Sequence, residues 1–189
     1  MVFLLPLMTA HFCSMPAFAQ SESLFGNDNP LEITLSGDIR DLLKDRGDDP
    51  QYHPFTLSYV GSDSALSTMP VKVRARGHFR KAKENCRMPP LLLNFPKKSV
   101  PANSIFKGQD KIKLVTPCQG DEYVVREYLV YKLYNLLNPK SFQAKLVNVV
   151  FNDTVRNRKD SFYGILLEDE EEMAKRNNTI AIDGKLVRP

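Results

Sequence analysis

The sequence predicts an α+β domain with a mostly antiparallel sheet and one long packed helix. Several segments alternate apolar and polar residues with the period of two that half-buried strands have. A long apolar helical segment follows them, and two more alternating segments come after it. The length of 189 residues and the hydrophobic content of 42% suit one domain, 31–189, that buries a core.

Residues 1–19 are predicted to be a secretory signal peptide. The segment has no charged residue, is apolar from Val2 to Phe12, and ends in Ala-Phe-Ala, the small-x-small pattern that signal peptidase accepts. Prolines interrupt its apolar run, which is shorter than the roughly 20 residues that span a bilayer. A buried N-terminal segment and an uncleaved anchor are the alternatives. We therefore expect an exported protein, periplasmic or extracellular, whose mature N-terminus, 20–30, is flexible.

Alternation and turn residues place the remaining elements in order. The predicted strands are 31–37, 55–60, 71–77, 90–95, 110–116, 144–153 and 161–169. A short helix is expected from Ile39 to Lys44, ended by Gly47 and Pro50, and a second short helix over 170–178, acidic at its start and basic at its end.

The segment 121–139 predicts the long helix. It has acids at its start, a body rich in Leu, Val and Tyr, and Asn138-Pro139 as a stop signal. Its apolar residues occupy most of the helix circumference, so we expect the helix to be covered on more than one side.

Two cysteines remain after the signal segment, and we predict that they form a disulfide. An antiparallel hairpin centred near residue 102 would pair Leu91 with Lys113, Phe95 with Gln109, and Cys86 with Cys118. A disulfide would then join the open end of the hairpin, as suits an oxidising compartment. Two free buried thiols are the alternative.

Positive charge is concentrated in the middle of the chain. Residues 20–69 hold nine acids and three bases, whereas residues 70–117 hold twelve bases and two acids, a local net charge of +10. Alternation puts Lys72, Arg74 and Arg76 on one strand face, and Lys111 with Lys113 on another. Neighbouring cationic strands would repel each other unless water, an acid or a bound anion offsets the charge.

Two interpretations of this basic region stay open, an ordinary solvated face and a phosphate site. Gly77 permits a sharp turn after Arg76, where backbone N–H groups and guanidinium groups can meet a phosphate. The phosphate-binding candidates are Arg76, Gly77, Arg80, Lys111, Lys113 and Glu127.

Other kinds of chemistry find little support in the sequence. His78 has no partner at metal-ligand spacing, and the acidic run 168–172 is typical of a helix start, so we predict no metal site. Nucleophilic triads, Walker loops and dinucleotide-binding glycine motifs do not occur, so we assign no catalytic residue. We expect no nucleic-acid partner for an exported protein and no membrane span in the mature chain.

A series of landmarks over residues 70–175 resembles the CotH-type, or spore-coat, atypical protein kinases. The landmarks are Arg76-Gly77, "RMPPLLLNF", "DKIKLVT", "VVREYLVYKLYNLL", "LVNVVFND" and "FYGILLEDEEE", in that order. The similarity corresponds to the N-terminal half of that family.

This resemblance implies a kinase N-lobe-like sheet and helix with a nucleotide beside them. It would place Arg76 to Arg80 near phosphates and pair Lys113 with Glu127, as the Lys and helix Glu pair in kinases. ATP and Mg²⁺ would be cofactors only if the resemblance extends to function. The family's Lys-rich strand is replaced here by Leu91 to Asn94, and its catalytic and metal-binding aspartates have no counterpart, since Asp183 lacks a neighbouring Asn or second Asp.

Two hypotheses about function therefore stand. One is an exported CotH-like protein, catalytically incomplete, with a basic edge that binds phosphate or nucleotide. The other is a non-enzymatic periplasmic or surface module that binds a protein or an anionic glycan. Whether the protein is an enzyme stays open at this point, and its partner is either an unidentified protein or a phosphate-bearing ligand.

Overall fold

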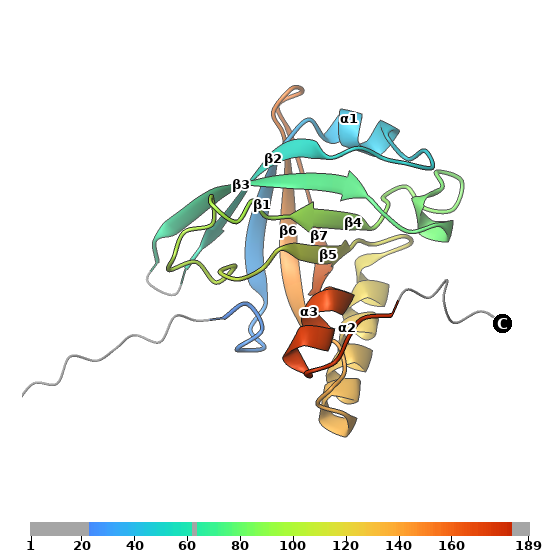
Figure 1. The fold of residues 1–189 in the computed structure, drawn as a ribbon. Coiled ribbons are helices and arrows are strands. Elements are labelled where there is room, and N and C mark those ends of the chain that lie inside the picture. The colour runs from blue at the N-terminus through green and yellow to red at the C-terminus, as the bar shows by residue number, and fades with distance from the viewer. Residues whose placement is uncertain (1–22, 62–63, 183–189) are drawn as a thin grey trace, which may run out of the picture.

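The strands of the protein form a closed barrel in a computed structural model that describes residues 23–61 and 64–182 (Figure 1). Around the barrel the order is β1, β2, β3, β4, β5, β7, β6, and β6 returns to β1 in parallel, while every other pair is antiparallel. The predicted signal peptide lies outside the described residues. The strands are β1 (Leu31–Gly37), β2 (His53–Val60), β3 (Leu66–Ala75), β4 (Leu91–Asn94), β5 (Lys111–Val115), β6 (Ala144–Asp153) and β7 (Arg158–Leu167).

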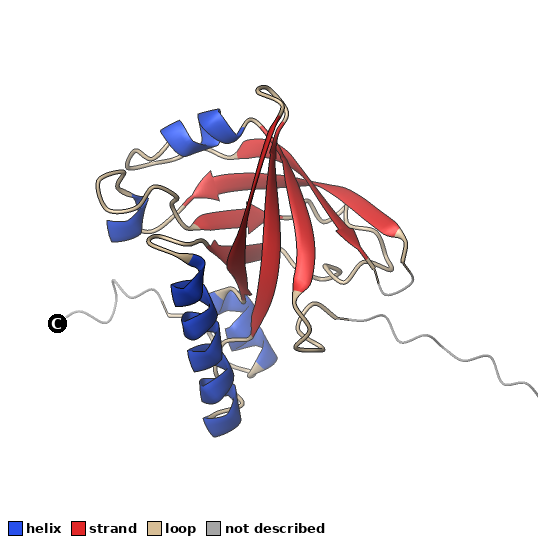
Figure 2. Ribbon diagram, turned by 180° about the vertical axis from the view of Figure 1, so that it is seen from behind, coloured by secondary structure: helices blue, strands red, loops and turns tan. Residues whose placement is uncertain are grey.

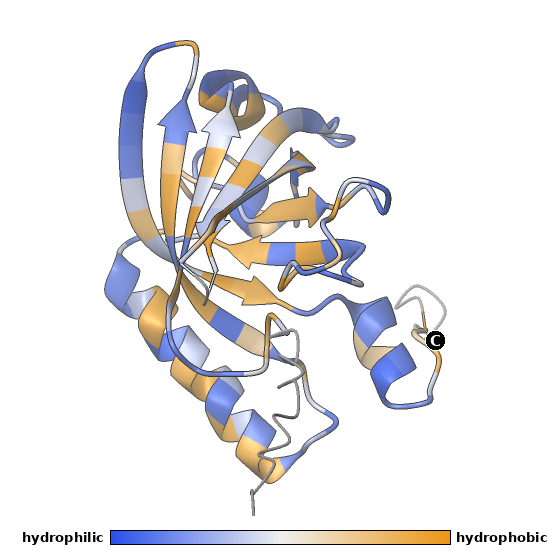
Figure 3. Ribbon diagram, turned by 90° about the vertical axis from the view of Figure 1, so that its left-hand side faces the viewer, coloured by the Kyte–Doolittle hydropathy of each residue, from blue (hydrophilic) through white to orange (hydrophobic). Residues whose placement is uncertain are grey.

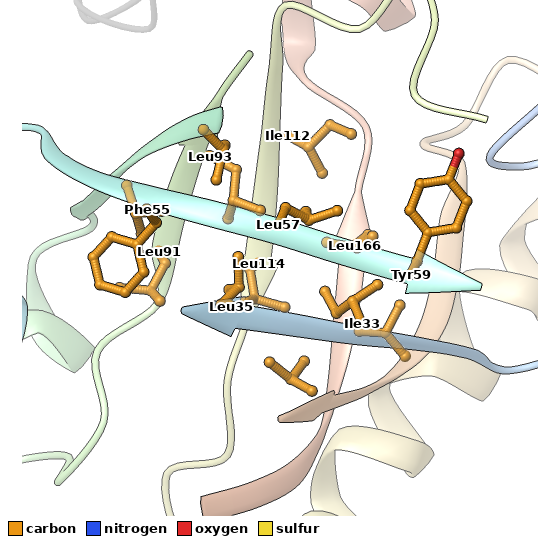
Figure 4. Packing of buried hydrophobic residues seen from close by; sticks show 14 of the residues in the cluster. Ile33, Leu35, Phe55, Leu57, Tyr59, Leu91, Leu93, Ile112, Leu114 and Leu166 are labelled. Atoms are coloured by element: carbon orange, nitrogen blue, oxygen red, sulfur yellow. The ribbon is translucent and has the colours of Figure 1, made fainter. Parts of the chain in front are cut away.

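Apolar side chains fill the interior of the barrel. Because successive side chains of a strand point to opposite faces, the apolar half of each alternating segment points inward. Figure 4 shows these side chains meeting between the strands. The core includes Ile33, Leu35, Leu57, Val73, Leu91, Leu93, Ile112, Leu114, Val147, Val149 and Leu166, all buried. A barrel of this size is therefore a packed core and not a channel.

The loop between β4 and β5 closes one end of the barrel. Its Phe106 is completely buried, lies stacked on Phe95 with 5.1 Å between ring centroids, and meets the edge of Tyr59 at 5.3 Å. The Tyr59 hydroxyl lies 3.0 Å from the Ser104 hydroxyl and accepts a hydrogen bond from the Ile105 N–H. A loop that looks polar in sequence thus contributes an aromatic plug.

The first described residues lie against the barrel. Leu24 is buried, and its N–H donates to the Ile105 carbonyl at 3.1 Å. Asp28 forms an ion pair with Lys132 at 2.6 Å. Part of the segment 20–30, predicted to be flexible, therefore makes specific contacts.

A short helix covers the other end of the barrel. Helix α1 has the predicted bounds, Ile39–Lys44, and begins where the Asp38 side chain accepts from the Asp41 N–H. It buries Ile39 and Leu42. Arg46, just after the helix, donates to the Cys86 carbonyl at 2.9 Å and so ties this end to the disulfide loop.

Helix α2 (Asp121–Leu137) lies on the outside of the barrel against β6 and β7. It packs Val124 and Tyr128 against Ile165 and Leu167 of β7. Figures 1 and 2 show its C-terminal half projecting beyond the strands. Within the described ranges, no helix combines the length and apolar character needed to cross a membrane.

The disulfide between Cys86 and Cys118 is confirmed, with 4.9 Å between the two Cα atoms. The hairpin register is one residue away from the prediction, because Leu92, and not Leu91, lies opposite Lys113. The observed register puts Leu91 opposite Leu114, both facing the core, whereas the predicted one would have turned Lys113 to the same face as Leu91. A slip of one residue exchanges the two faces, so burial selects the observed register.

The predicted fold class is wrong. The predicted α+β fold with one long packed helix, similar to a kinase N-lobe, is replaced in the described residues by a closed barrel of seven strands with helices on its outside and at one end. Closure depends on β1 pairing in parallel with β6, where Leu31 lies opposite Val147. Helix α2 is also not covered on more than one side, since Val124 and Tyr128 are its buried residues.

Candidate functional site

Cationic side chains meet on the outer face of β3, β4 and β5. Val73 points into the barrel, so the next residue on β3, Arg74, points outward. The register places Leu92 of β4 between Arg74 and Lys113 of β5. Strand β4 therefore separates the two cationic strands and inserts an apolar residue between their charges. The direct repulsion expected from neighbouring cationic strands does not arise.

Lys113 is buried and forms an ion pair with Glu170 of helix α3 (Glu170–Arg176). Its side chain is 5% exposed, and its ammonium group lies 5.0 Å from the centroid of the Phe142 ring. A buried ammonium is costly unless an acid or an aromatic face compensates it, and here both do. Burial alone would raise the pKa of the Glu170 carboxyl, but its hydrogen bond to Lys113 and the charges of Lys113 and Arg76 lower it overall.

The acidic run 168–172 supplies the start of α3, as predicted. Asp169 is the N-cap and accepts from the Glu171 N–H at 3.2 Å. The buried Glu168 carboxylate forms an ion pair with the Arg176 guanidinium, with 2.8 Å between Oε2 and Nη2. Burial raises the pKa of the Asp169 carboxyl, although the hydrogen bond from Glu171 and the charges of Lys113 and Lys111 offset part of that rise. The run therefore anchors α3 on the barrel.

Between these elements lies a pocket of about 570 Å³, which we call the basic pocket. Figure 1 shows α3 beside β5, and both elements contribute lining residues to this pocket. Its walls come from the barrel, from the start of α3 and from residues near the end of the described chain. The lining residues are Arg74, Arg76, Leu92, Lys111, Lys113, Asp169, Glu170, Glu171, Ala181 and Ile182.

Three cationic side chains of the basic pocket form no ion pair with a carboxylate of the described residues. Among the described residues, Arg74, Arg76 and Lys111 take part in no ion pair. The Arg74 guanidinium lies over the Tyr52 ring, 4.8 Å from its centroid, and its buried Nε has no hydrogen-bond partner there. Buried polar atoms of proteins are almost always paired, so the Arg74 Nε is a donor that the described chain does not use.

The structure brings together three of the six sequence-predicted site residues, namely Arg76, Lys111 and Lys113. Gly77 follows Arg76 with a φ of 84°, a left-handed turn that favours glycine. Arg80 lies elsewhere and donates to the Thr116 carbonyl beside the disulfide loop. Glu127 lies on α2, and in the described structure the carboxylate that pairs with Lys113 is Glu170 instead.

Sequence reasoning missed the acids of the basic pocket. Asp169, Glu170 and Glu171 were recognised as a helix start but not as neighbours of the basic strands. Charge complementarity could have revealed these neighbours. A buried lysine on β5 needs a carboxylate, and residues 168–172 are the densest cluster of carboxylates in the chain. Within residues 23–61 and 64–182, no group of three or more His, Cys, Asp or Glu residues could hold a metal ion.

The fold and the site together define the class of this molecule as a small closed β-barrel with a mixed-charge basic pocket on its outer face. Comparison with protein-family models, curated proteins and solved structures finds no match to the chain.

Proposed function

We propose that this protein is an exported binding module, without catalytic activity of its own, that holds a phosphate-bearing ligand in the basic pocket. The observation that carries this proposal is the convergence of Arg74, Arg76 and Lys111, none of them in an ion pair with a described residue, around one pocket of about 570 Å³. Pockets of this size accommodate small organic ligands.

The two arginines suit an oxyanion such as phosphate. A guanidinium presents a rigid fork of N–H donors that matches two phosphate oxygens, and hydrogen bonds between ionised groups are about twice as strong as neutral ones. Lys111 adds a point charge from β5, and the left-handed turn at Gly77 follows Arg76 directly. A phosphate is therefore expected beside β3 and β5.

The acids on α3 limit what else the ligand carries. Asp169 and Glu171 line the same pocket and would repel a second concentrated negative charge. This arrangement favours a small phosphate ester, whose uncharged or amine-bearing body faces α3, over a long anionic glycan. A relationship to the CotH-type family is a separate proposal that rests on the sequence landmarks alone.

Export is part of the proposal and rests on two features. The chain has a disulfide between Cys86 and Cys118, and disulfides persist mainly in oxidising compartments. The apolar, uncharged segment at residues 1–19 has the pattern of a signal peptide. Mass spectrometry of protein recovered from the exporting host would test both, with cleavage after Ala19 and no thiol available for alkylation as the expected results.

Calorimetric titration tests the ligand. We expect binding of inorganic phosphate, pyrophosphate or ATP to the intact protein, and we expect Arg76→Ala to weaken it about tenfold or more, because a hydrogen bond to a charged group contributes about 1.5–3 kcal/mol. Lys159→Ala is the matched control, since Lys159 is exposed on β7 and lies outside the basic pocket. Titrating ATP with and without Mg²⁺ shows whether a nucleotide is preferred over the simple anions.

Two results would sink this proposal. One is the failure of the intact protein to bind any of these anions at millimolar concentration. The other is equal weakening by Arg76→Ala and Lys159→Ala, which would reveal only general charge attraction. Binding of a sulfated or carboxylated glycan without binding of the phosphate probes would support the anionic-glycan hypothesis instead.

Asp169→Asn is expected to strengthen anion binding about three- to tenfold, because a nearby unit charge contributes about 1 kcal/mol in a partly solvated site. Asparagine also caps helices, so α3 should persist.

As the pH falls through the raised pKa of Asp169, the wild-type pocket loses a negative charge and should bind sulfate more tightly. Sulfate titrations between pH 4 and pH 7 should show a flatter profile for Asp169→Asn; an unchanged profile would exclude Asp169 as the cause.

A further inference from the structure

Helix α2 carries an exposed apolar surface, which we call the α2 surface. It consists of seven large side chains, each between 52% and 84% exposed: Tyr123, Leu129, Val130, Leu133, Tyr134, Leu136 and Leu137. Figure 3 shows apolar residues along the whole helix, and Figure 2 shows its C-terminal half extending beyond the strands. Contiguous apolar surface of this kind is rare on soluble monomers and marks an interaction site.

The α2 surface is self-complementary. At 3.6 residues per turn, Leu133 lies at its centre, Leu129 and Val130 lie one turn before it, and Leu136 and Leu137 lie one turn after it. A two-fold axis at Leu133 would place Leu129 of one antiparallel helix against Leu137 of the other. A closed symmetric dimer requires this property, since the same patch must match itself.

Two cationic side chains beside the α2 surface make contacts within their own chain. The Arg126 guanidinium lies over the Tyr123 ring, 5.5 Å from its centroid. The Lys132 ammonium pairs with Asp28 on the side of the helix that faces the barrel. Leu133 lies about two helical turns from Arg126, so the apolar residues around Leu133 can be covered while the Arg126 guanidinium stays at the rim of the surface.

The size of the α2 surface matches a dimer interface. Each large apolar side chain exposes on the order of 80–100 Å² at these exposures, so seven of them present roughly 600 Å². A standard interface buries about 800 Å² on each partner, and adjoining polar residues would contribute the remainder.

We propose that the α2 surface is the interface of a homodimer, in which two copies of α2 pack antiparallel about Leu133. The proposal is independent of ligand binding. None of the residues that line the basic pocket belongs to α2, so the interface uses none of the residues that line the pocket.

Light scattering after size exclusion, together with sedimentation equilibrium at micromolar concentrations, tests the dimer. The intact protein is expected to be dimeric, and Leu133→Asp monomeric with an unchanged far-UV circular dichroism spectrum. Val155→Asp is the matched control, because Val155 is equally apolar and 70% exposed but lies in the turn between β6 and β7. The control should remain dimeric.

Cross-linking tests the antiparallel arrangement. In a Cys13→Ser background, Leu133→Cys should form an intermolecular disulfide on mild oxidation, whereas Tyr123→Cys should not, since only residues near the axis come within the Cα distance that a disulfide needs. A monomeric wild type, or a Leu133→Asp variant that stays dimeric, would overturn the proposal. Co-sedimentation of a monomeric wild type with neutral phosphatidylcholine vesicles, lost in Leu133→Asp, would also overturn it and identify a lipid-binding face instead.

Discussion

Phe106→Ala is expected to lower the free energy of unfolding by about 3–5 kcal/mol, the range for removing a large aromatic side chain from a packed core. Phe106 is completely buried and contacts the rings of both Phe95 and Tyr59 at the end of the barrel. Its removal leaves a cavity and loses two aromatic contacts. Urea unfolding monitored by circular dichroism measures the change.

Phe79→Ala is the control for this substitution. Phe79 lies in the 3₁₀ turn after β3 and is 73% exposed, so its removal should change the unfolding free energy by less than about 0.5 kcal/mol. If Phe106→Ala were as mild as Phe79→Ala, the loop between β4 and β5 would not close the barrel as described.

Removal of the disulfide is expected to cost about 3–4 kcal/mol in the chain-entropy model, because Cys86 and Cys118 are 32 residues apart in sequence. The variant Cys86→Ser with Cys118→Ser should melt roughly 10 °C lower than the wild type for a domain of this size. Differential scanning calorimetry with and without reductant measures the effect. Reductant should lower the wild-type melting temperature and leave the double variant unchanged; equal stability of the two proteins would contradict the stabilising role of the bond.

Local structure could be predicted well from the sequence because local physics determines it. Alternation identified the strands, since a strand that faces a core on one side must bury every second residue. Helix α1 was predicted with its observed bounds, Ile39–Lys44, because Gly47 and Pro50 end the helical segment, and the structure adds Asp38 as its N-cap. The disulfide followed from the hairpin that brings its two ends together.

Barrel closure could not be predicted in this way. Strand β1 pairs with β6 across more than a hundred residues, and alternation contains no information about which strand is the partner. The hairpin register failed for a related reason. Symmetry about a loop centre fixes the pairing only to within one residue, and the core contacts of Leu91 and Leu93 then decide it.

The candidate site was only partly visible in the sequence. Alternation correctly placed Arg74, Lys111 and Lys113 on the outward strand faces, but the acids that share their pocket, including the Glu170 that pairs with Lys113, come from a segment more than fifty residues later. The resemblance to kinases implied Glu127 as the partner of Lys113. The barrel instead turns the outer face of β5 toward α3, where Glu170 compensates the buried ammonium.

The central claim is that a phosphate-bearing ligand binds in the basic pocket. Amide chemical-shift mapping by ¹⁵N–¹H NMR during a pyrophosphate titration tests it most directly. We expect saturable shifts at residues 74–77, 91–94, 111–113 and 169–171, and their loss in Arg76→Ala. Shifts scattered over all basic surfaces, shifts confined to the disulfide loop, or no shifts at all would contradict it.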